Sequence, residues 1–194
     1  MAVEVTRRRQ IESVASQLFR ERGYAATSVR DIARALDIQG ASLYAHVASK
    51  EDVLWAIVAR AAERFESAVA EATAPDQPAG EKLRAMCRAH LAVVTEELGA
   101  AVVFQHEWRA LGERRREEVR RMRDRYERHF REVIAAGTAS GELSSDDPDL
   151  AAKAILTALN GVADWYRPDG RLSAHQVADA YADLFAGALE GVER

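Results

Sequence analysis

The sequence predicts an all-α fold of about nine helices, in which a three-helix N-terminal head with a helix-turn-helix precedes a larger C-terminal helical bundle. Only four prolines occur among 194 residues, and helix-forming residues dominate. Apolar residues recur at helical spacing along most of the chain. A hydrophobic content of 48% with 30% charged residues is ordinary for a globular protein, and the chain is long enough to bury a sizeable core.

The first predicted helix carries Ile11, Leu18 and Phe19 on its apolar face and ends at Gly23, a residue typical of helix C-termini. Residues 1–6 are expected to form an irregular arm. Three consecutive arginines follow this arm at positions 7–9. They either contact a nucleic-acid phosphate or minor groove, or simply form a solvated helix start, and the sequence leaves both open.

Residues 27–50 predict a helix-turn-helix. Ser28 and Asp31 have the spacing of a capping box, which opens a helix by satisfying its first free amides. A second short helix is expected from about residue 40 to 46, with Leu43 pointing inward. Two short helices joined by a tight turn, the second polar on its outer face, are typical of an element that reads DNA.

Several polar side chains of this segment are candidate DNA contacts. Gln39 and Ser42 are the best candidates for base edges, because Gln can pair bidentately with adenine and Ser with several bases. Tyr44 and His46 are expected to contact phosphates, although Tyr44 could instead pack between helices and His46 could be an ordinary surface residue. Lys50 is disfavoured by the helix dipole, so a compensating phosphate is expected there. The full predicted set is Arg7, Arg8, Thr27, Ser28, Arg30, Gln39, Gly40, Ala41, Ser42, Tyr44, His46 and Lys50.

The order of L-Y-x-H and S-K-E-D-V-L after a helix and a turn resembles the tetracycline-repressor (TetR) family of bacterial transcriptional regulators. The residues that carry the resemblance are Thr27, Ser28, Ile32, Ala33, Ile38, Leu43, Tyr44, His46, Lys50, Glu51 and Leu54. The chain departs from the family at Val47, where Phe is usual, and at Gln39, where Ser or Thr is frequent. We expect a DNA-binding domain at residues 1–50 and an effector-binding and dimerisation domain at residues 51–194.

The larger domain is expected to hold six helices. Ser49 and Asp52 repeat the capping-box spacing and open a long helix to about Thr73, after which Pro75 and Pro78 break the chain. The other helices are expected at about 81–98, 102–111, 114–134, 148–166 and 173–189. A Gly/Ser/Asp-rich loop is expected at 137–148, and Asp147 and Ser173 are the expected caps of the last two helices.

The segment 114–131 contains nine arginines and could be mistaken for a nucleic-acid-binding patch. Its apolar residues form an inward stripe at helical spacing that includes Val119, Tyr126 and Phe130. Acid-before-base pairs at i, i+4 are expected on the opposite side, namely Glu117–Arg121, Asp124–Arg128 and Glu127–Arg131. The pattern therefore favours a solvated helix face over a second DNA contact.

The last two helices carry small and apolar residues on more than one face, so they need a partner beyond their own core. A four-helix interface of a two-fold homodimer supplies that partner and agrees with what the family resemblance implies. The alternative is a final hairpin buried within a monomer. The predicted interface residues are Leu150, Ala154, Ala158, Gly161, Tyr181, Leu184 and Phe185.

The effector pocket is predicted from helices that the TetR family arranges around a cavity. The candidate lining residues are Phe65, Met86, His90, Phe104, Gln105, Trp108, Tyr126, Asn160 and Trp165, each of which could instead be plain core. Residues 165–173 resemble a stretch of TetR-type repressors of lipid and steroid catabolism, some of which respond to acyl-CoA thioesters. Arg167 and Arg171 could then meet CoA phosphates, or could be exposed residues of a structural turn.

Other functional classes are disfavoured by composition and motifs. The formal net charge of −4 argues against a generic polyanion binder. The five histidines form no metal or nucleophile motif, so we expect neither an enzyme nor a metal or cofactor. Cys87 is the only cysteine, and no apolar run is long enough to span a bilayer, which favours a cytoplasmic protein without membrane contact.

The sequence thus predicts a ligand-responsive transcriptional regulator that binds palindromic double-stranded operator DNA as a homodimer. A two-fold dimer places two reading helices in successive major grooves, which gives the selectivity that one helix-turn-helix lacks. The favoured interpretation is a repressor released from its operator by a small apolar or acyl-CoA-type effector. The same fold acting as an activator, or without an effector, is the alternative.

Overall fold

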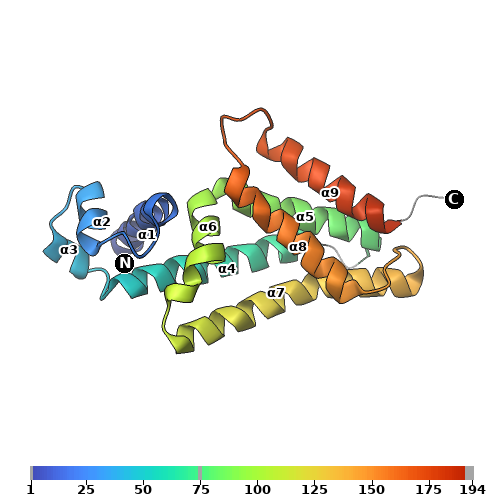
Figure 1. Cartoon of the computed structure of the whole chain (residues 1–194), viewed down its shortest axis with the longest axis horizontal. Helices are drawn as coiled ribbons and strands as arrows, with labels where there is room; N and C mark the ends of the chain where they lie inside the picture. Colours follow the sequence, from blue (N-terminus) through green and yellow to red (C-terminus); the bar gives the residue numbers. More distant parts are fainter. Residues whose placement is uncertain (1, 74–75, 191–194) are drawn as a thin grey trace. The chain divides into compact units, whose positions relative to one another are not determined.

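The computed structural model describes residues 2–73 and 76–190, and the side chains from residue 7 onward. Over these residues the chain forms nine α-helices and one short 3-10 turn, and it has no β-strand (Figure 1). The helical fold class predicted from the sequence is therefore confirmed.

The helices divide between two compact units, which are described separately. The first unit runs to Ala62 and includes Leu98–Arg120, whereas the second comprises Glu63–Glu97 and the chain from Arg121 onward. The first contains α1 (Ala2–Arg22), α2 (Val29–Ala35), α3 (Gly40–Tyr44), the start of α4 (Lys50–Ala72), α6 (Leu98–His106), the 3-10 turn Glu107–Ala110 and the start of α7 (Glu113–Ser140). The second contains the remainder of α4 and α7, together with α5 (Ala79–Glu96), α8 (Pro148–Trp165) and α9 (Ala174–Glu190).

The helix starts follow the capping signals in the sequence. The Ser28 hydroxyl accepts the Asp31 backbone N–H at 3.2 Å, and the Asp31 carboxylate accepts the Ser28 backbone N–H at 2.9 Å. Asp147 accepts the backbone N–H of Leu150 at 3.0 Å, and Pro148 occupies the first turn of α8. The predicted capping roles of Ser28 and Asp147 are confirmed, and each satisfies amides that a helix start leaves free.

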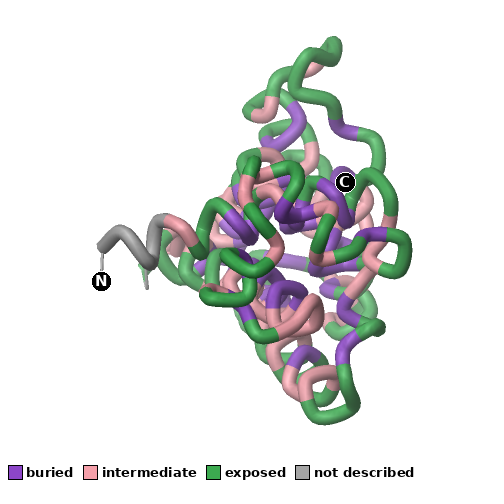
Figure 2. Tube along the Cα trace, turned by 90° about the vertical axis from the view of Figure 1, so that its left-hand side faces the viewer, coloured by how far each residue is buried: buried purple, intermediate pink, exposed green. Residues whose placement is uncertain are grey.

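Each unit has its own apolar core. In the first, α1 packs against α2 and α6, and Ile11, Ile32 and Leu43 are fully buried. In the second, α5 packs along α9 and against α8, and fully buried residues include Leu83 and Leu159. Buried and exposed residues alternate along the helices, as expected for amphipathic helices around a core (Figure 2).

Three segments differ from the sequence prediction. Residues 2–6, expected to be irregular, belong to α1. The predicted helix at 102–111 is instead α6, which begins at Leu98, followed by the 3-10 turn. The loop expected from Gly137 begins only after Ser140.

Gly137 lies within α7, where the absence of a side chain allows close packing against neighbouring residues; it does not end the helix. A Cβ added there would lie 2.6 Å from the Ala79 Cβ and 2.7 Å from the Leu143 side chain. The left-handed residue that ends this region is Gly141, with φ of 81°. Glycine therefore has two separate uses here, and sequence pattern alone does not distinguish them.

The arginine-rich α7 has ion pairs on its exposed side, whereas the three i, i+4 pairs expected from the sequence stay predictions. Arg120 bonds Glu117 at 2.9 Å within the helix, whereas Arg131 bonds Asp149 of α8 at 3.1 Å and so reaches another element. These exposed pairs contribute little to stability individually.

Candidate functional site

The short helix α3 presents a polar surface over an apolar anchor. Leu43 is fully buried and Val47 is 7% exposed, whereas Tyr44 is 56% exposed. Gln39 is the N-cap residue of α3, but its exposed side chain makes no capping hydrogen bond. A side chain that is not used to start the helix is available to a partner. The geometry therefore agrees with the predicted outward orientation of Gln39 and Tyr44.

The turn between α2 and α3 is tight because Asp37 adopts a left-handed conformation, with φ of 53°. Beside it lies a depression of about 410 Å³, whose lining includes Arg30, Arg34, Gln39 and Gly40. Arg30 and Arg34 place cations next to the start of α3, although Asp37 also lines the depression and Arg34 pairs with Asp31 at 3.4 Å. Cations placed locally in this way are what binding to a phosphate backbone requires.

Lys50 connects α4 to the segment before α2. Its Nζ donates to the backbone carbonyls of Tyr24 and Thr27, both at 2.8 Å, and lies 4.1 Å from the centroid of the Tyr24 ring. An ammonium has three N–H donors, so one donor is left beyond these two bonds. Lys50 therefore positions the head, and a contact from its third donor to a phosphate stays a prediction.

Thr27 was predicted to contact DNA, but its side chain is not on the surface. It is 1% exposed, and its hydroxyl donates to the Gly23 carbonyl at 2.9 Å. We therefore assign Thr27 to the internal structure of the head. Arg7 donates to Gln10 at 3.0 Å and Arg8 pairs with Glu12 at 3.5 Å, so both have partners within α1.

The first turns of α4 and α7 are joined by a cluster of charges. Arg115 donates to Glu51 at 3.2 Å and to Asp52 at 2.5 Å, and the Glu51 carboxylate also accepts the Gly112 backbone N–H at 3.2 Å. The bond from Arg115, with a second from Ser49, holds the pKa of Asp52 below its usual value. This cluster fixes the start of α4 next to Lys50.

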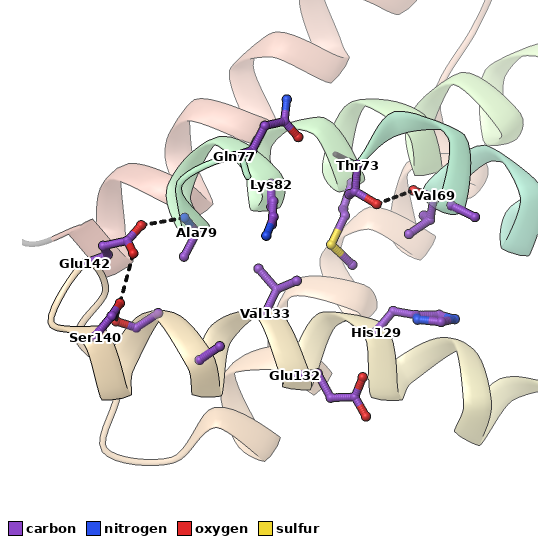
Figure 3. A pocket seen from close by; sticks show the side chains of 14 residues that line it. Val69, Thr73, Gln77, Ala79, Lys82, His129, Glu132, Val133, Ser140 and Glu142 are labelled. Carbon is purple, nitrogen blue, oxygen red and sulfur yellow. Dashed lines mark hydrogen bonds between the residues drawn. The ribbon is translucent and has the colours of Figure 1, made fainter. Parts of the chain in front are cut away.

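A pocket of about 560 Å³ lies within the second unit, between α4, α5 and α7 (Figure 3). Its volume is in the range of small-molecule sites. Its lining residues are Val69, Ala70, Thr73, Gln77, Ala79, Lys82, Met86, His129, Glu132, Val133, Ala136, Gly137, Ser140 and Glu142. Lys82 and Val133 point into the space between α5 and α7 (Figure 3).

One end of this pocket is polar. Glu142 accepts the backbone N–H of Ala79 at 2.6 Å, and Ser140 donates to the same carboxylate at 3.0 Å. The bond from Ala79, assisted by Ser140 and by the charge of Lys82, lowers the pKa of Glu142. On the other side, His129 bonds Glu66 at 2.6 Å.

Three of the predicted pocket residues form one aromatic layer. The ring centroids of Phe65 and His90 are 4.7 Å apart, and Tyr126 lies 5.8 Å from both. His90 Nδ1 and the Tyr126 hydroxyl are 3.0 Å apart. Burial lowers the pKa of His90 to about 3, with a smaller contribution from the charge of Arg123, so the imidazole is neutral at neutral pH.

The other predicted pocket residues are dispersed. Met86 lines the pocket, whereas Phe104, Gln105 and Trp108 are buried in the first unit. Trp165 is 47% exposed and stacks on Tyr181, with 6.5 Å between ring centroids. The half-buried Asn160 lies on α8. An effector contact stays a prediction for the five residues outside the pocket, namely Phe104, Gln105, Trp108, Asn160 and Trp165.

Helices α8 and α9 carry several large apolar side chains that are exposed. Leu150 and Leu184 are 63% and 62% exposed, and Tyr181 and Phe185 form an edge-to-face pair at 5.9 Å. A Cβ added at Gly161 would meet nothing within 4 Å. Three of the four large exposed apolar residues in the described part of the chain, namely Leu150, Trp165 and Leu184, lie on this helix pair.

Sequence reasoning missed the polar lining of the pocket, including Gln77, Lys82, His129 and Glu142. Lys82 and His129 lie on amphipathic helices, and Gln77 and Glu142 lie in connecting segments. At such positions a polar residue is usually solvated, so it gives no signal of a cavity. A usable signal was the set of apolar residues on three different helices that also line the pocket, namely Val69, Met86 and Val133.

The described residues include no group of three or more metal-ligating side chains. None of the described helices is long and apolar enough to cross a membrane.

Fold and site together define a helix-turn-helix DNA-binding transcriptional regulator with a separate helical body. Residues 11–57 match the family described as bacterial regulatory proteins, tetR family. Residues 76–189 match the tetracyclin repressor-like C-terminal domain. The chain belongs to the TetR family of bacterial regulatory proteins.

Several known proteins are similar to this chain over nearly its full length. The HTH-type transcriptional repressor KstR2 of Mycobacterium tuberculosis is 30% identical over 195 residues, covering 96% of each chain. The TetR-family regulator PfmR from Thermus thermophilus is 36% identical with a TM-score of 0.85, covering 95% of this chain and 99% of that one. AibR in complex with isovaleryl coenzyme A and operator DNA is 29% identical with a TM-score of 0.83, covering 92% of this chain and 97% of that one.

Proposed function

We propose that this protein is a repressor that binds a palindromic DNA operator as a homodimer and leaves it when a small apolar or acyl-CoA-type effector binds. The observation that carries the proposal is the α3 surface, where polar residues are exposed above a fully buried Leu43. The buried leucine fixes the helix, so the polar side chains can enter a major groove in a defined orientation.

The proposed DNA contacts fall into two groups. Gln39 and Ser42 contact base edges, with Ala41 offering a methyl group to thymine and Gly40 allowing close approach. Phosphate contacts come from the remaining cations and hydroxyls, namely Arg7, Arg8, Ser28, Arg30, Tyr44, His46 and Lys50. Ser28 and Lys50 combine this role with the structural bonds described above.

The exposed apolar face of α8 and α9 is the proposed dimer interface. Leu150, Trp165 and Leu184 present apolar surface that water disfavours, and a second copy of the same helix pair would bury it. A dimer is also what the reading function needs, because two α3 helices then enter major grooves one helical turn apart.

The proposed effector site is the pocket between α4, α5 and α7, with the aromatic layer beyond it. AibR has been observed with isovaleryl coenzyme A and operator DNA, and this chain resembles it over nearly its full length. An apolar acyl group suits the Val69, Met86 and Val133 side of the pocket. Arg167 and Arg171 are exposed in the connection between α8 and α9 and are candidate partners of CoA phosphates.

Cys87 is buried, and burial raises the pKa of its thiol to about 12, so it stays protonated. A buried free thiol suits a reducing compartment. We place the protein in the cytoplasm, where operator DNA and CoA thioesters occur together.

The proposal is tested by selecting bound fragments from the source genome and titrating each complex with C4–C8 acyl-CoA thioesters. We expect an inverted-repeat fragment to be bound selectively and released by a thioester but not by free CoA. Binding that no thioester reverses would remove the effector part of the proposal. Binding without sequence preference would remove the operator part.

A further inference from the structure

His90 has an unused hydrogen-bonding atom in the interior of the second unit. The residue is 2% exposed, and its Nε2 has no hydrogen-bond partner among the described residues. Leaving a buried polar atom unpaired is unfavourable, and native proteins rarely do so without a reason. Its other ring nitrogen, Nδ1, is paired with the Tyr126 hydroxyl at 3.0 Å.

This atom lies in the layer next to the pocket. Phe65, His90 and Tyr126 are each three or four residues, about one helical turn, from a pocket-lining residue on the same helix. Those lining residues are Val69 on α4, Met86 on α5 and His129 on α7. A ligand that extends from the pocket along these three helices therefore meets the aromatic layer next.

The hydrogen bond between His90 and Tyr126 determines whether His90 Nε2 is a donor or an acceptor. The His90 Nδ1 and the Tyr126 hydroxyl are 3.0 Å apart. A phenol is the better donor and an imidazole nitrogen the better acceptor, so we assign Tyr126 as the donor and His90 Nδ1 as the acceptor. The neutral imidazole then carries its only proton on Nε2. The unpaired atom is consequently a hydrogen-bond donor, and a ligand must supply the acceptor.

The surroundings restrict that acceptor to an uncharged group. Phe65 packs against His90 and Phe130 packs against Tyr126, with ring centroids 4.7 Å and 5.7 Å apart respectively. Burial also lowers the pKa of His90 to about 3, so its imidazole brings no positive charge that would offset an anionic ligand group. Moving a carboxylate into such a layer is costly, whereas a carbonyl oxygen is not.

We propose that the Nε2–H of His90 recognises a neutral carbonyl oxygen on an otherwise apolar ligand that enters from the pocket between α4, α5 and α7. The proposal deepens the effector function above and rests on it, because it assigns the chemistry that the same site selects. Ketone and thioester carbonyls both meet the requirement, whereas hydrocarbons and carboxylates do not.

The test uses the full-length protein and three small probes of similar shape, namely cyclohexanone, methylcyclohexane and cyclohexanecarboxylate. Imidazole ¹⁵N resonances report on His90 directly, and probe affinities come from the same titrations. We expect cyclohexanone to shift the His90 Nε2 resonance and to bind about three- to tenfold more tightly than methylcyclohexane, as one neutral hydrogen bond provides. Equal affinity for the two probes, a preference for the carboxylate, or no shift at His90 would overturn the proposal.

A double variant separates recognition from folding. His90→Leu with Tyr126→Phe removes both the buried donor and its partner, a change that is close to neutral for stability. This variant should still bind methylcyclohexane but should lose the preference for cyclohexanone, while the exposed control His175→Leu keeps it. A double variant that folds and retains the preference would show that His90 is not the recognising group.

The failure of carbonyl recognition by His90 can be distinguished from the failure of the proposed repressor function. If no acyl-CoA releases the operator, the proposed effector class fails even where cyclohexanone shifts His90. If the resonance does not move while an acyl-CoA releases the operator, the carbonyl recognition by His90 fails and the repressor function stands.

Discussion

The guanidinium of Arg115 donates to the carboxylate of Asp52 at 2.5 Å, which joins the first turn of α7 to the first turn of α4. Glu51 accepts a second bond from the same guanidinium at 3.2 Å. Lys50, which directly precedes Glu51, donates to the backbone carbonyls of Tyr24 and Thr27 just before α2. The reading head is thus held through a continuous set of polar contacts that begins at α7.

Replacing Arg115 is expected to weaken operator binding more than it weakens the fold. Arg115→Gln removes two charge-assisted bonds, and because the groups are partly exposed we expect a loss of about 1 kcal/mol in unfolding free energy. Operator affinity should fall by about tenfold or more as the start of α4 loosens. Arg114→Gln, at an exposed neighbour, is the matched control, and fluorescence anisotropy with a labelled operator measures both variants.

Substitutions on α3 are expected to separate base reading from phosphate contact. Gln39→Ala should change which sequences are selected, because a base-edge contact is lost. Tyr44→Phe should instead reduce affinity by a similar factor on all sequences, because a phosphate contact carries no sequence information. Fragment selection repeated with each variant is the measurement, and the reverse pattern would mean that the two roles are interchanged.

A charge on the exposed face of α9 is expected to prevent dimerisation without unfolding the protomer. Leu184 is 62% exposed, so Leu184→Glu removes little from the protomer core, but it would place a carboxylate in an apolar interface. We expect a monomer by light scattering, with operator affinity reduced by at least 100-fold. His175→Glu, exposed at the start of α9, should remain dimeric. A dimer for both variants would locate the interface elsewhere.

Two glycine substitutions of the same kind are expected to act in opposite directions. Gly137→Ala places a Cβ 2.6 Å from the Ala79 Cβ and should destabilise the protein by about 1–3 kcal/mol. Gly187→Ala places its Cβ in open space on α9 and should stabilise it by about 0.5–1 kcal/mol through helix propensity. Thermal unfolding distinguishes them, and equal effects would contradict the close packing at Gly137.

His90 is expected to make stability depend on pH in a range where carboxylates contribute little. Burial lowers the pKa of His90 to about 3 in the folded protein. In the unfolded chain the imidazole has its ordinary pKa of 6.5, so it is protonated once the pH falls below that value. The unfolded state therefore holds more protons between these values, and stability falls as pH is lowered through 6.5. At pH 4.5 the loss from this residue should be about 2–3 kcal/mol. Urea unfolding at a series of pH values measures it, and the His90→Leu/Tyr126→Phe variant should show a flatter profile.

The parts predictable from sequence were those set by local rules. The Ser28–Asp31 capping box and the Asp147 cap depend on residues three positions apart, so spacing alone indicates them. The buried Leu43 followed from helical periodicity in the same way.

The rest depends on contacts between distant segments. Gly137 looked like a helix end because its close neighbour Ala79 is 58 positions away in sequence. Lys50 looked like an outward cation, since nothing local showed that the carbonyls of Tyr24 and Thr27 would surround it. The pocket joins the end of α4, the start of α5 and the C-terminal part of α7, which helical periodicity does not place together.

The most direct test of the central claim is the spacing of half-sites in operators selected by the wild-type protein and by Gln39→Ala. The account predicts an inverted repeat whose half-sites are centred about 34–36 Å apart, or at a multiple of that distance, with altered base preference in the variant at symmetric positions of both half-sites. A single half-site, or a preference unchanged by the substitution, would contradict the placement of two α3 helices in major grooves of one duplex.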